Sequence, residues 1–463
     1  MNLPDPAPTN PAAAPASLPA HSLPKGDAAE RVPNTPPLRV RYDISILGYA
    51  HVYGSTGKTG IHRVVEELGF RLAASPRCAL SLSALHCYPD AQRYLAETPR
   101  WAGYKLALAR DKSLLRAALK QVNARIDSNR PRHSMPLRLA RKPLHWIYGF
   151  PSGTDYPDYP VGDLRTIDVF HSASAGLPPG LKRRRGLACF QTVYDLIPVL
   201  FDDVVVGHQR QHMAATLRAL KEDNWALAIS QSTKNDLCGY TGIDPDRVFV
   251  TPLAADPAKF YPCRDAARVD DVRARYAIPP GPYLLSVCTL EPRKNLDTLI
   301  RCFARVASEP GMSEYSLVLT GNVGWKDQKI YETLAQTPGL TGRVVVTGYV
   351  ADDDLAPLYS GATAFAYPSL YEGFGLPPLE AMQCGTPTLT SDTSSLPEVV
   401  GDAGIMASPR DEDALCQGML DLCLNGVLRA DLAARALVRA AQFSWERCTT
   451  QTLDAYAAGL AGS

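Results

Sequence analysis

Short apolar runs rich in branched and aromatic residues alternate with segments of helical spacing along most of this 463-residue chain. The first half contains strand-like runs at residues 166–171, 187–196, 225–230 and 247–255. A second series follows at residues 282–290, 316–321, 342–350, 363–369 and 386–391. Parallel strands need a long crossover connection, usually a helix. The alternation therefore predicts an α/β protein whose parallel sheets are covered by helices on both faces.

The chain length favours two doubly wound domains, because one hydrophobic core seldom serves more than about 300 residues. Ordered sequence begins near Leu38, with a strand predicted over residues 39–50 and a helix over 59–75. The segment 260–281 lacks strand character and ends in Pro-Pro-Gly, so we place the domain boundary there. We assign residues 1–37 to a disordered Pro/Ala-rich leader, 38–265 and 276–443 to the two domains, and 444–463 to a final helix.

Charge and cysteine content exclude several classes of protein. A net charge of +1 gives no global attraction to nucleic acid, so we expect no nucleic-acid partner. The eleven cysteines are scattered without a Cys-x-x-Cys pair, which predicts reduced, mostly buried thiols and no metal site. We expect a cytoplasmic protein, because the N-terminus lacks the pattern of a secretory signal and prolines interrupt the longest uncharged stretch, residues 355–371.

A basic stretch runs from Arg100 to Lys142, inside a weakly helical insertion at about residues 90–145. It holds twelve Lys and Arg residues against Asp111 and Asp127. One interpretation is a solvated helical excursion. The other is a basic face that meets the inner surface of an anionic membrane, as a peripheral contact, or a phosphorylated acceptor.

The segment "SLYEGFGLPPLEAMQCG" holds two glutamates eight positions apart around a glycine loop. Pro377 and Pro378 suit the first turn of a helix and Gly385 suits its end, so Glu380 lies in the first or second turn. A carboxylate there can accept hydrogen bonds from both hydroxyls of a ribose, while glycines after Glu372 let a ligand approach the backbone amides. The alternative is a solvated helix after an ordinary turn.

"LEPRKNLDTLI" places Arg293 and Lys294 after the predicted strand at 282–290. Loops at the carboxyl ends of parallel strands line the ligand crevice of a doubly wound sheet. We therefore expect these two cations to neutralise a leaving diphosphate. The alternative is a solvated helix N-terminus, although cations there oppose the helix dipole.

Together with "LVLTGNVGW", "GYVADDDLAPLYSGATAFAYPS", "SLPEVVGDAG" and "FSWERC", these motifs resemble the retaining glycosyltransferases of family four, in their bacterial polysaccharide mannosyl- and rhamnosyltransferase-like branch. The resemblance is dense from about residue 283 to 447. It is looser in the first half, through "TGIHRVV", "TVYDLIPVLF" and "AISQSTKNDL". Residues 1–37 and about 90–145 lie outside it.

The resemblance implies the GT-B fold, in which two Rossmann-like domains face each other across a cleft and a final helix crosses back to the first. It also implies a nucleotide-sugar donor on the second domain, a glycan or lipid-linked glycan acceptor on the first, retained anomeric configuration, and neither metal nor cofactor. The expected role is hexose transfer in surface polysaccharide assembly such as lipopolysaccharide, with GDP-mannose as the first donor expected.

Site residues follow from matching positions. The resemblance assigns donor-sugar contact to Glu372, ribose contact to Glu380, and diphosphate contact to Arg293 and Lys294. Further donor contacts are expected from Gly373, Phe374, Gly375, Leu376 and Gly321, and an acceptor and phosphate loop from Gly57 and Gly60.

Two departures from the family pattern concern catalysis. Tyr194 and Asp195 stand where the family often has His-Asp, and a tyrosine is a poor proton acceptor near neutral pH. Either Tyr194 positions the sugar, or His171 or His51 serves nearby, or activity is impaired. Val287 and Cys288 replace a common Gly-Arg pair. Two alternatives remain: a non-catalytic sugar-nucleotide or glycan-binding relative, and another GT-B enzyme such as a nucleotide-sugar epimerase.

Overall fold

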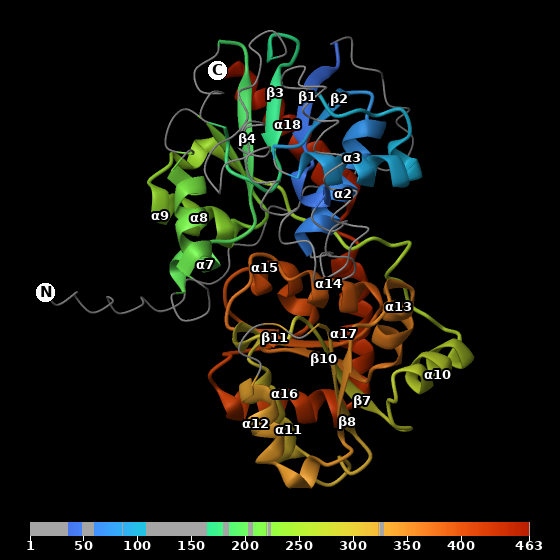
Figure 1. The fold of residues 1–463 in the computed structure, drawn as a ribbon. Coiled ribbons are helices and arrows are strands. Elements are labelled where there is room, and N and C mark those ends of the chain that lie inside the picture. Colours follow the sequence, from blue (N-terminus) through green and yellow to red (C-terminus); the bar gives the residue numbers. More distant parts are fainter. Residues whose placement is uncertain are drawn as a thin grey trace, which may run out of the picture. The chain divides into compact units, whose positions relative to one another are not determined.

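The structure is a computed structural model that describes part of the chain in detail. The described residues are 36–48, 60–85, 87–107, 164–178, 185–201, 207–218, 220, 224–322, 324 and 328–462. Most of the predicted leader and most of the basic stretch, together with Gly57 and His51, lie outside them. Figure 1 shows two parallel sheets within this part, each flanked by helices.

The first sheet forms the N-terminal lobe and has the strand order β2-β1-β3-β4-β5-β6, with all neighbours parallel. Its strands are β1 (Leu38–Asp43), β2 (Cys78–Ser83), β3 (Val169–Ser172), β4 (Ala188–Val193), β5 (Trp225–Ala228) and β6 (Val248–Val250). Its helices are α2 (Gly60–Ala74), α3 (Tyr88–Glu97), α7 (Ile197–Leu200), α8 (Gly207–Arg218) and α9 (Gln231–Thr241).

The strand predicted over residues 39–50 is wrong for residues 44–48, and β2 was not predicted. Residues 49 and 50 lie outside the described residues. β1 ends at Asp43, and residues 45–48 are helical. The Asp43 carboxylate accepts hydrogen bonds from the backbone amide and the hydroxyl of Ser45. This local turn ends the strand although the apolar run continues.

The second sheet forms the C-terminal lobe and has the parallel order β12-β11-β10-β7-β8-β9. Its strands are β7 (Tyr283–Val287), β8 (Ser316–Thr320), β9 (Val344–Gly348), β10 (Ala364–Tyr367), β11 (Thr388–Ser391) and β12 (Ile405–Ala407). Its helices are α10 (Ala266–Arg275), α11 (Leu296–Val306), α12 (Gln328–Ala335), α13 (Asp352–Gly361), α14 (Leu376–Gln383), α15 (Leu396–Val400), α16 (Glu412–Leu424) and α17 (Gly426–Ala440).

Both sheets confirm the predicted doubly wound α/β class. In the second sheet the chain first builds outward from β7 through β8 to β9, and then returns to the other side of β7 with β10. The strand order therefore reverses between β7 and β10. Ligands of open α/β sheets bind beyond the carboxyl ends of the strands at such a reversal.

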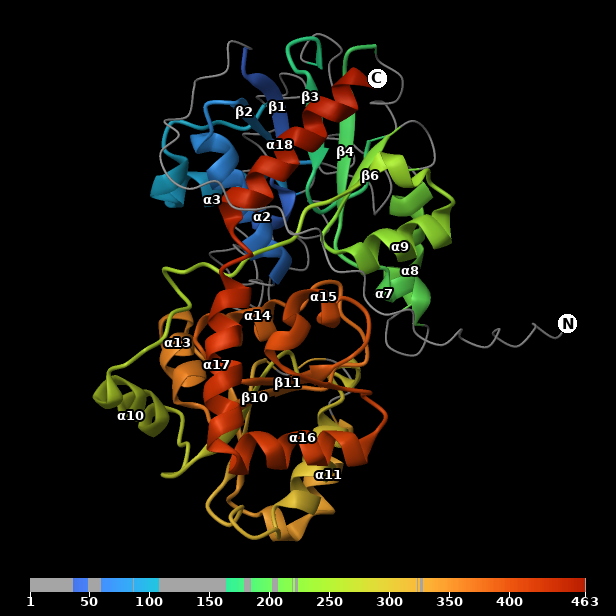
Figure 2. The ribbon, with the colours of Figure 1, turned by 180° about the vertical axis from the view of Figure 1, so that it is seen from behind.

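The final helix, α18 (Trp445–Ala461), lies along the sheet of the N-terminal lobe, as Figure 2 shows from behind. Its N-cap is Ser444, as predicted, since the hydroxyl accepts a hydrogen bond from the Arg447 amide. Tyr456 is fully buried and its ring meets Phe190 of β4 at 5.0 Å between centroids. The preceding helix, α17, contacts α14 of the C-terminal lobe instead.

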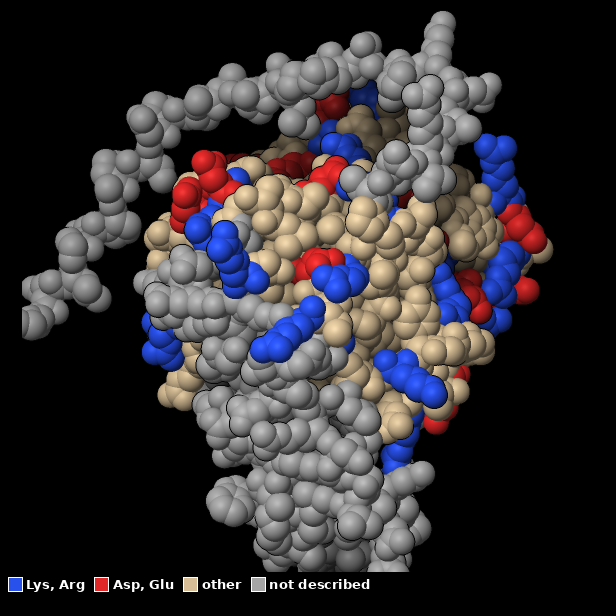
Figure 3. All heavy atoms as spheres, turned by 90° about the horizontal axis from the view of Figure 1, so that it is seen from above, with Lys and Arg blue, Asp and Glu red and all other residues tan. Residues whose placement is uncertain are grey.

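The structure also shows the state of the cysteines, the distribution of surface charge and the character of the helices. All eleven cysteines are free and eight are buried, as expected. In the view of Figure 3, the Lys and Arg side chains of the described residues are spread over a mostly tan surface, and several of them lie beside Asp or Glu. Among the described helices, none combines the length and apolarity that crossing a membrane would require.

Candidate functional site

A cavity of about 440 Å³ lies at the reversal point between β7 and β10. Its volume is within the range of about 300–1,000 Å³ that is typical of small-molecule sites. Apart from the alternative candidate His171, its lining brings together the predicted site residues that the structure describes: Gly60, Tyr194, Asp195, Arg293, Lys294, Gly321, Glu372, Gly373, Phe374, Gly375, Leu376 and Glu380. Gly57 is outside the described residues.

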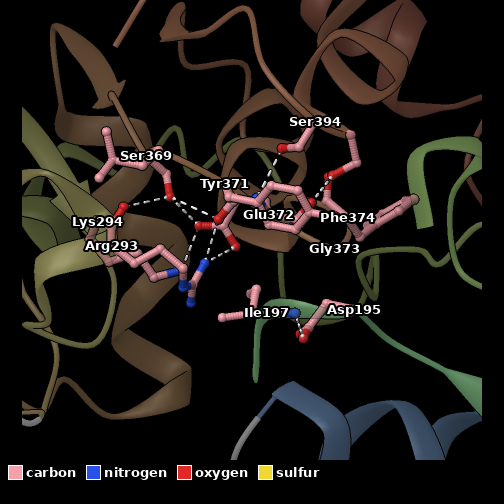
Figure 4. Close-up of polar contacts among 12 residues, drawn as sticks. Asp195, Ile197, Arg293, Lys294, Ser369, Tyr371, Glu372, Gly373, Phe374 and Ser394 are labelled. Atoms are coloured by element: carbon pink, nitrogen blue, oxygen red, sulfur yellow. Dashed lines mark hydrogen bonds and ion pairs between the residues drawn. The ribbon is translucent and has the colours of Figure 1, made fainter. Parts of the chain in front are cut away.

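Arg293 and Lys294 both reach the carboxylate of Glu372 (Figure 4). The Lys294 ammonium lies 2.6 Å from Oε1 and the Arg293 guanidinium 3.0 Å from Oε2. Ser369 donates its hydroxyl to Oε1 as well, at 2.6 Å. These side chains meet because the loops after β7 and β10 are neighbours at the point of reversal.

This arrangement adds ion pairs that the sequence did not indicate. We expected the cations to face a diphosphate and Glu372 to face a sugar, as separate contacts. In the structure Glu372 balances both cations, and Arg293 also pairs with Glu291 at 2.6 Å. Burial would raise the pKa of Glu372, but Lys294 and Arg293 lower it to about 2. Glu372 is therefore an ionised carboxylate at neutral pH.

The two cations lie in a short 3₁₀ turn, Pro292–Lys294, rather than in α11 itself. Asn295 ends that turn in the left-handed region, with φ 58°. Its side-chain amide donates to the carbonyls of Pro368 and Pro409, at 3.1 and 2.8 Å. The turn is therefore fixed against the loop after β10, which holds the Lys294 ammonium beside Glu372.

Glu380 lies in the second turn of α14, and its side chain is 7% exposed. Its Oε1 accepts a hydrogen bond from the Arg63 guanidinium at 2.6 Å, and its Oε2 accepts one from the Tyr359 hydroxyl at 3.0 Å. Burial raises the pKa of Glu380, whereas Arg63 and Tyr359 lower it, and the net direction is upward. Arg63 comes from α2 in the other lobe and also lines the cavity.

Sequence reasoning missed Arg63, although the residue stands in the quoted motif "TGIHRVV". Its spacing from Gly60 could have placed it one turn into the predicted helix, on the side of the glycine. No local signal identifies Glu380 as its partner.

The glycine loop after Glu372 is tightly enclosed. A Cβ on Gly373 would lie 2.0 Å from the carbonyl oxygen of Tyr194, so only glycine fits there. The hydroxyl of Ser230, at the start of α9, donates to the Gly373 carbonyl at 2.7 Å. Gly375 has φ +111°, a conformation that favours glycine. Within its own lobe, the Ser395 hydroxyl lies 2.9 and 2.7 Å from the carbonyls of Glu372 and Phe374, so the loop is held from both lobes.

Gly321 follows β8 and is also required by close approach. Its φ is +141°, and a Cβ there would lie 1.9 Å from the carbonyl oxygen of Cys288. Both residues line the cavity. The backbones of Gly321 and Cys288 therefore approach each other closely beside the cavity.

Tyr194, Asp195 and His171 have different surroundings. Tyr194 lines the cavity but donates its hydroxyl to the carbonyl of Ala173 at 2.8 Å, and burial raises its pKa. The Asp195 carboxylate accepts a hydrogen bond from the Ile197 amide, at the first residue of α7, at 3.0 Å (Figure 4), and burial raises the pKa of Asp195. His171 is not part of the lining. It is fully buried between Tyr456 and Thr192, and burial lowers its pKa to about 3.

Comparisons with known proteins found relatives in sequence and in fold. The model of the family described as glycosyl transferases group 1 matches residues 269–439. The chain is 35% identical over 303 residues to the O-antigen chain mannosyltransferase B of Escherichia coli, covering 65% of this chain and 75% of the relative. It is 33% identical over 266 residues to the serotype-specific mannosyltransferase WbdA of the same species, but spans only 32% of that longer protein and 57% of itself.

The solved structure of sucrose-phosphate synthase from Thermosynechococcus elongatus is similar in fold, with a TM-score of 0.61. The two share 20% sequence identity, and the match covers 93% of this chain and all of the other. At this identity the likeness concerns the fold alone.

Proposed function

Since the chain belongs to the group 1 glycosyl transferases, we propose that it moves a hexose from a nucleoside-diphosphate sugar to a glycan or lipid-linked glycan acceptor in surface polysaccharide assembly. Its relatives from Escherichia coli are mannosyltransferases, one of them named for the O-antigen chain. On this basis GDP-mannose is the proposed donor.

The observation that carries the proposal is the cluster of Arg293, Lys294 and Glu372 at the reversal point of the second sheet. A diphosphate in the cavity would meet both cations and the amides of the glycine loop. Fixed cations stabilise negative charge as it develops on the leaving group. Glu372 balances the cations before the donor binds, and can accept hydrogen bonds from sugar hydroxyls.

The proposed chemistry is a retaining, front-face transfer that uses protein cations in place of a metal. The bond between the anomeric carbon and the diphosphate oxygen breaks, and a new bond forms from that carbon to the acceptor oxygen. The leaving phosphate oxygen takes the proton of the acceptor hydroxyl. The protein orients the two substrates and stabilises the departing diphosphate.

Tyr194 fits a positioning role in this proposal better than a proton-accepting one. Its hydroxyl is already donated to the backbone of Ala173, and its raised pKa keeps it protonated near neutrality. The peripheral contact of the basic stretch with a membrane also stays a proposal, since most of that stretch lies outside the described residues.

The proposal is tested by binding and transfer. A panel of nucleotide sugars is screened by thermal shift, where a ligand at a hundred times its Kd stabilises the folded protein by about 2.7 kcal/mol. With the donor so chosen, Lys294→Ala is expected to reduce kcat by about 10²–10³-fold, because an oriented charge on the leaving group is lost. Release of the nucleoside diphosphate without sugar transfer would favour a hydrolytic or non-transferring relative.

The matched control is Lys329→Ala. Lys329 is another cation of the same lobe, and its ammonium lies 2.7 Å from Asp297, but it does not line the cavity. Near-normal transfer by Lys294→Ala, or an equal loss in both variants, would refute the role given to Lys294.

A further inference from the structure

Arg63 is the cavity-lining cation that the proposed mechanism does not use. It lies one turn into α2, and its side chain is 25% exposed. Its guanidinium lies 2.6 Å from Oε1 of Glu380, 3.9 Å from Asp352 and 5.5 Å from the centre of the Phe260 ring. The strongest of these contacts therefore joins the N-terminal lobe to the carboxylate that we assign to the donor's ribose.

Both oxygens of Glu380 are fixed, yet both can accept more. Oε1 accepts from Arg63 and Oε2 from Tyr359. Each carboxylate oxygen offers about two acceptor sites, so one site remains on each. Two free acceptor sites on neighbouring oxygens match the two adjacent hydroxyls of a ribose. The existing contacts set the plane of the carboxylate in advance.

Arg63 also supplies the charge balance that a buried carboxylate needs. Glu380 is 5% exposed, and burial disfavours its ionised form. A protonated carboxyl group would offer one donor in place of an acceptor site, which the ribose could not use equally well. Tyr359 contributes a hydrogen bond but no charge.

We propose that Arg63 is a positioning residue that holds the Glu380 carboxylate in place for the two ribose hydroxyls of the donor. The donor site is thus completed by α2 of the N-terminal lobe, although its other ligating residues lie mainly on the C-terminal lobe. This inference rests on the proposed function, because it takes Glu380 as the ribose ligand.

The test compares two nucleotides that differ only in the ribose hydroxyls. GDP and 2′,3′-dideoxy-GDP are titrated by calorimetry into the wild type and Arg63→Met; the UDP pair replaces them if the wild type prefers uridine. Arg63→Met should weaken GDP binding by at least about tenfold, the usual effect of losing an oriented hydrogen bond to a charged group. It should change dideoxy-GDP binding by less than about twofold. Arg63→Lys should recover part of the GDP affinity.

The matched control is Arg71→Met. Arg71 lies two turns further along α2 and pairs with Glu67 and Glu446, outside the cavity. The Arg71→Met variant should keep the wild-type preference for GDP over dideoxy-GDP. Thermal unfolding of each variant separates loss of binding from loss of fold.

A pH series gives a second readout. The titratable and charged groups facing Glu380 are Arg63 of α2, Asp352 and Tyr359 of α13, and Cys384 at the end of α14. Without Arg63 the pKa of Glu380 rises further, so GDP binding by Arg63→Met should strengthen as pH rises from about 6 to 9. The wild type should change less over the same range.

Two results would overturn the inference. If Arg63→Met weakens the binding of GDP and dideoxy-GDP equally, Arg63 acts on the phosphates or stabilises the fold. If Arg63→Met leaves the GDP affinity unchanged, Arg63 has no role in binding. Neither would affect the proposed function if the wild type still transfers sugar. Conversely, a wild type that binds no nucleotide sugar refutes the proposed function itself.

Discussion

Glu372 illustrates how a single residue gains its properties from charges brought in by the fold. It is 8% exposed and would be costly to ionise alone, but Lys294 and Arg293 lower its pKa from 4.5 to about 2. Breaking such a buried pair from one side leaves an uncompensated charge. Removing one member of this cluster is therefore expected to destabilise the folded protein.

This predicts a specific dependence of stability on pH. Because the folded pKa of Glu372 is depressed, its contribution is complete above the unfolded value of 4.5 and is lost as pH falls toward about 2. The contribution is of order 3 kcal/mol at neutral pH. Chemical unfolding of wild type and Glu372→Gln is measured from pH 7 downward, and the difference in unfolding free energy should shrink below pH 4.5.

Glu446→Gln is the control for that series. Glu446 is 77% exposed and pairs with Arg71 on the surface, where ion pairs contribute about 0–1 kcal/mol. If the difference in unfolding free energy between wild type and Glu372→Gln stays constant down to about pH 2, the lowered pKa of Glu372 is contradicted.

At the scale of elements, helix ends account for much of the local order. Several helices have an N-cap residue whose side chain accepts a hydrogen bond from a backbone amide of the first turn. These residues are Ser230 for α9, Asp265 for α10, Asp411 for α16, Asn425 for α17 and Ser444 for α18. α14 differs, because it begins at Gly375 with no side-chain cap. Of its first three residues only Leu376 has an amide N–H, because Pro377 and Pro378 lack one; Leu376 lines the cavity, where an anionic ligand can accept from that amide.

Ser444→Ala should destabilise the protein by about 1 kcal/mol, because the cap of α18 is lost. Ser444→Asp keeps an acceptor at the same position and should unfold within a few tenths of a kcal/mol of the wild type. Urea denaturation of the three proteins checks this. Equal destabilisation by alanine and aspartate would show that packing, not capping, fixes Ser444.

At the scale of the whole molecule, the lobes also meet away from the cavity's cation cluster. The Glu398 carboxylate of α15 accepts from the backbone amides of Gln231 and Ser232, at 2.7 and 2.6 Å, at the start of α9. A carboxylate at a helix N-terminus is favoured by the unpaired amides and the helix dipole. Together with the hydrogen bond from the Ser230 hydroxyl to the Gly373 carbonyl, this contact links the start of α9 to the C-terminal lobe.

Glu398→Ala should therefore loosen the start of α9. Amide exchange in a peptide covering residues 230–241 should accelerate by about tenfold or more, since hydrogen bonds to a charged acceptor are lost. Hydrogen exchange with mass spectrometry measures this directly. Glu412→Ala is the control, because Glu412 pairs with Arg301 and Arg305 of its own lobe. Unchanged exchange in Glu398→Ala would mean that the contact between Glu398 and α9 does not hold the lobes together.

The sequence by itself determined the parallel α/β class, most of the strands, the cap at Ser444 and the loop glycines, because each depends on residues close together in the chain. It also predicted that the loops carrying Glu372, Glu380, Arg293 and Lys294 meet, since loops after parallel strands lie at one edge of a sheet. These four residues line one cavity, and their roles in binding stay predictions. It overextended β1, where the apolar run hides the turn at Asp43. Only the tertiary structure decided which charges pair. Arg63 and Glu380 are 317 positions apart, and their contact depends on how two lobes pack, which no local pattern encodes.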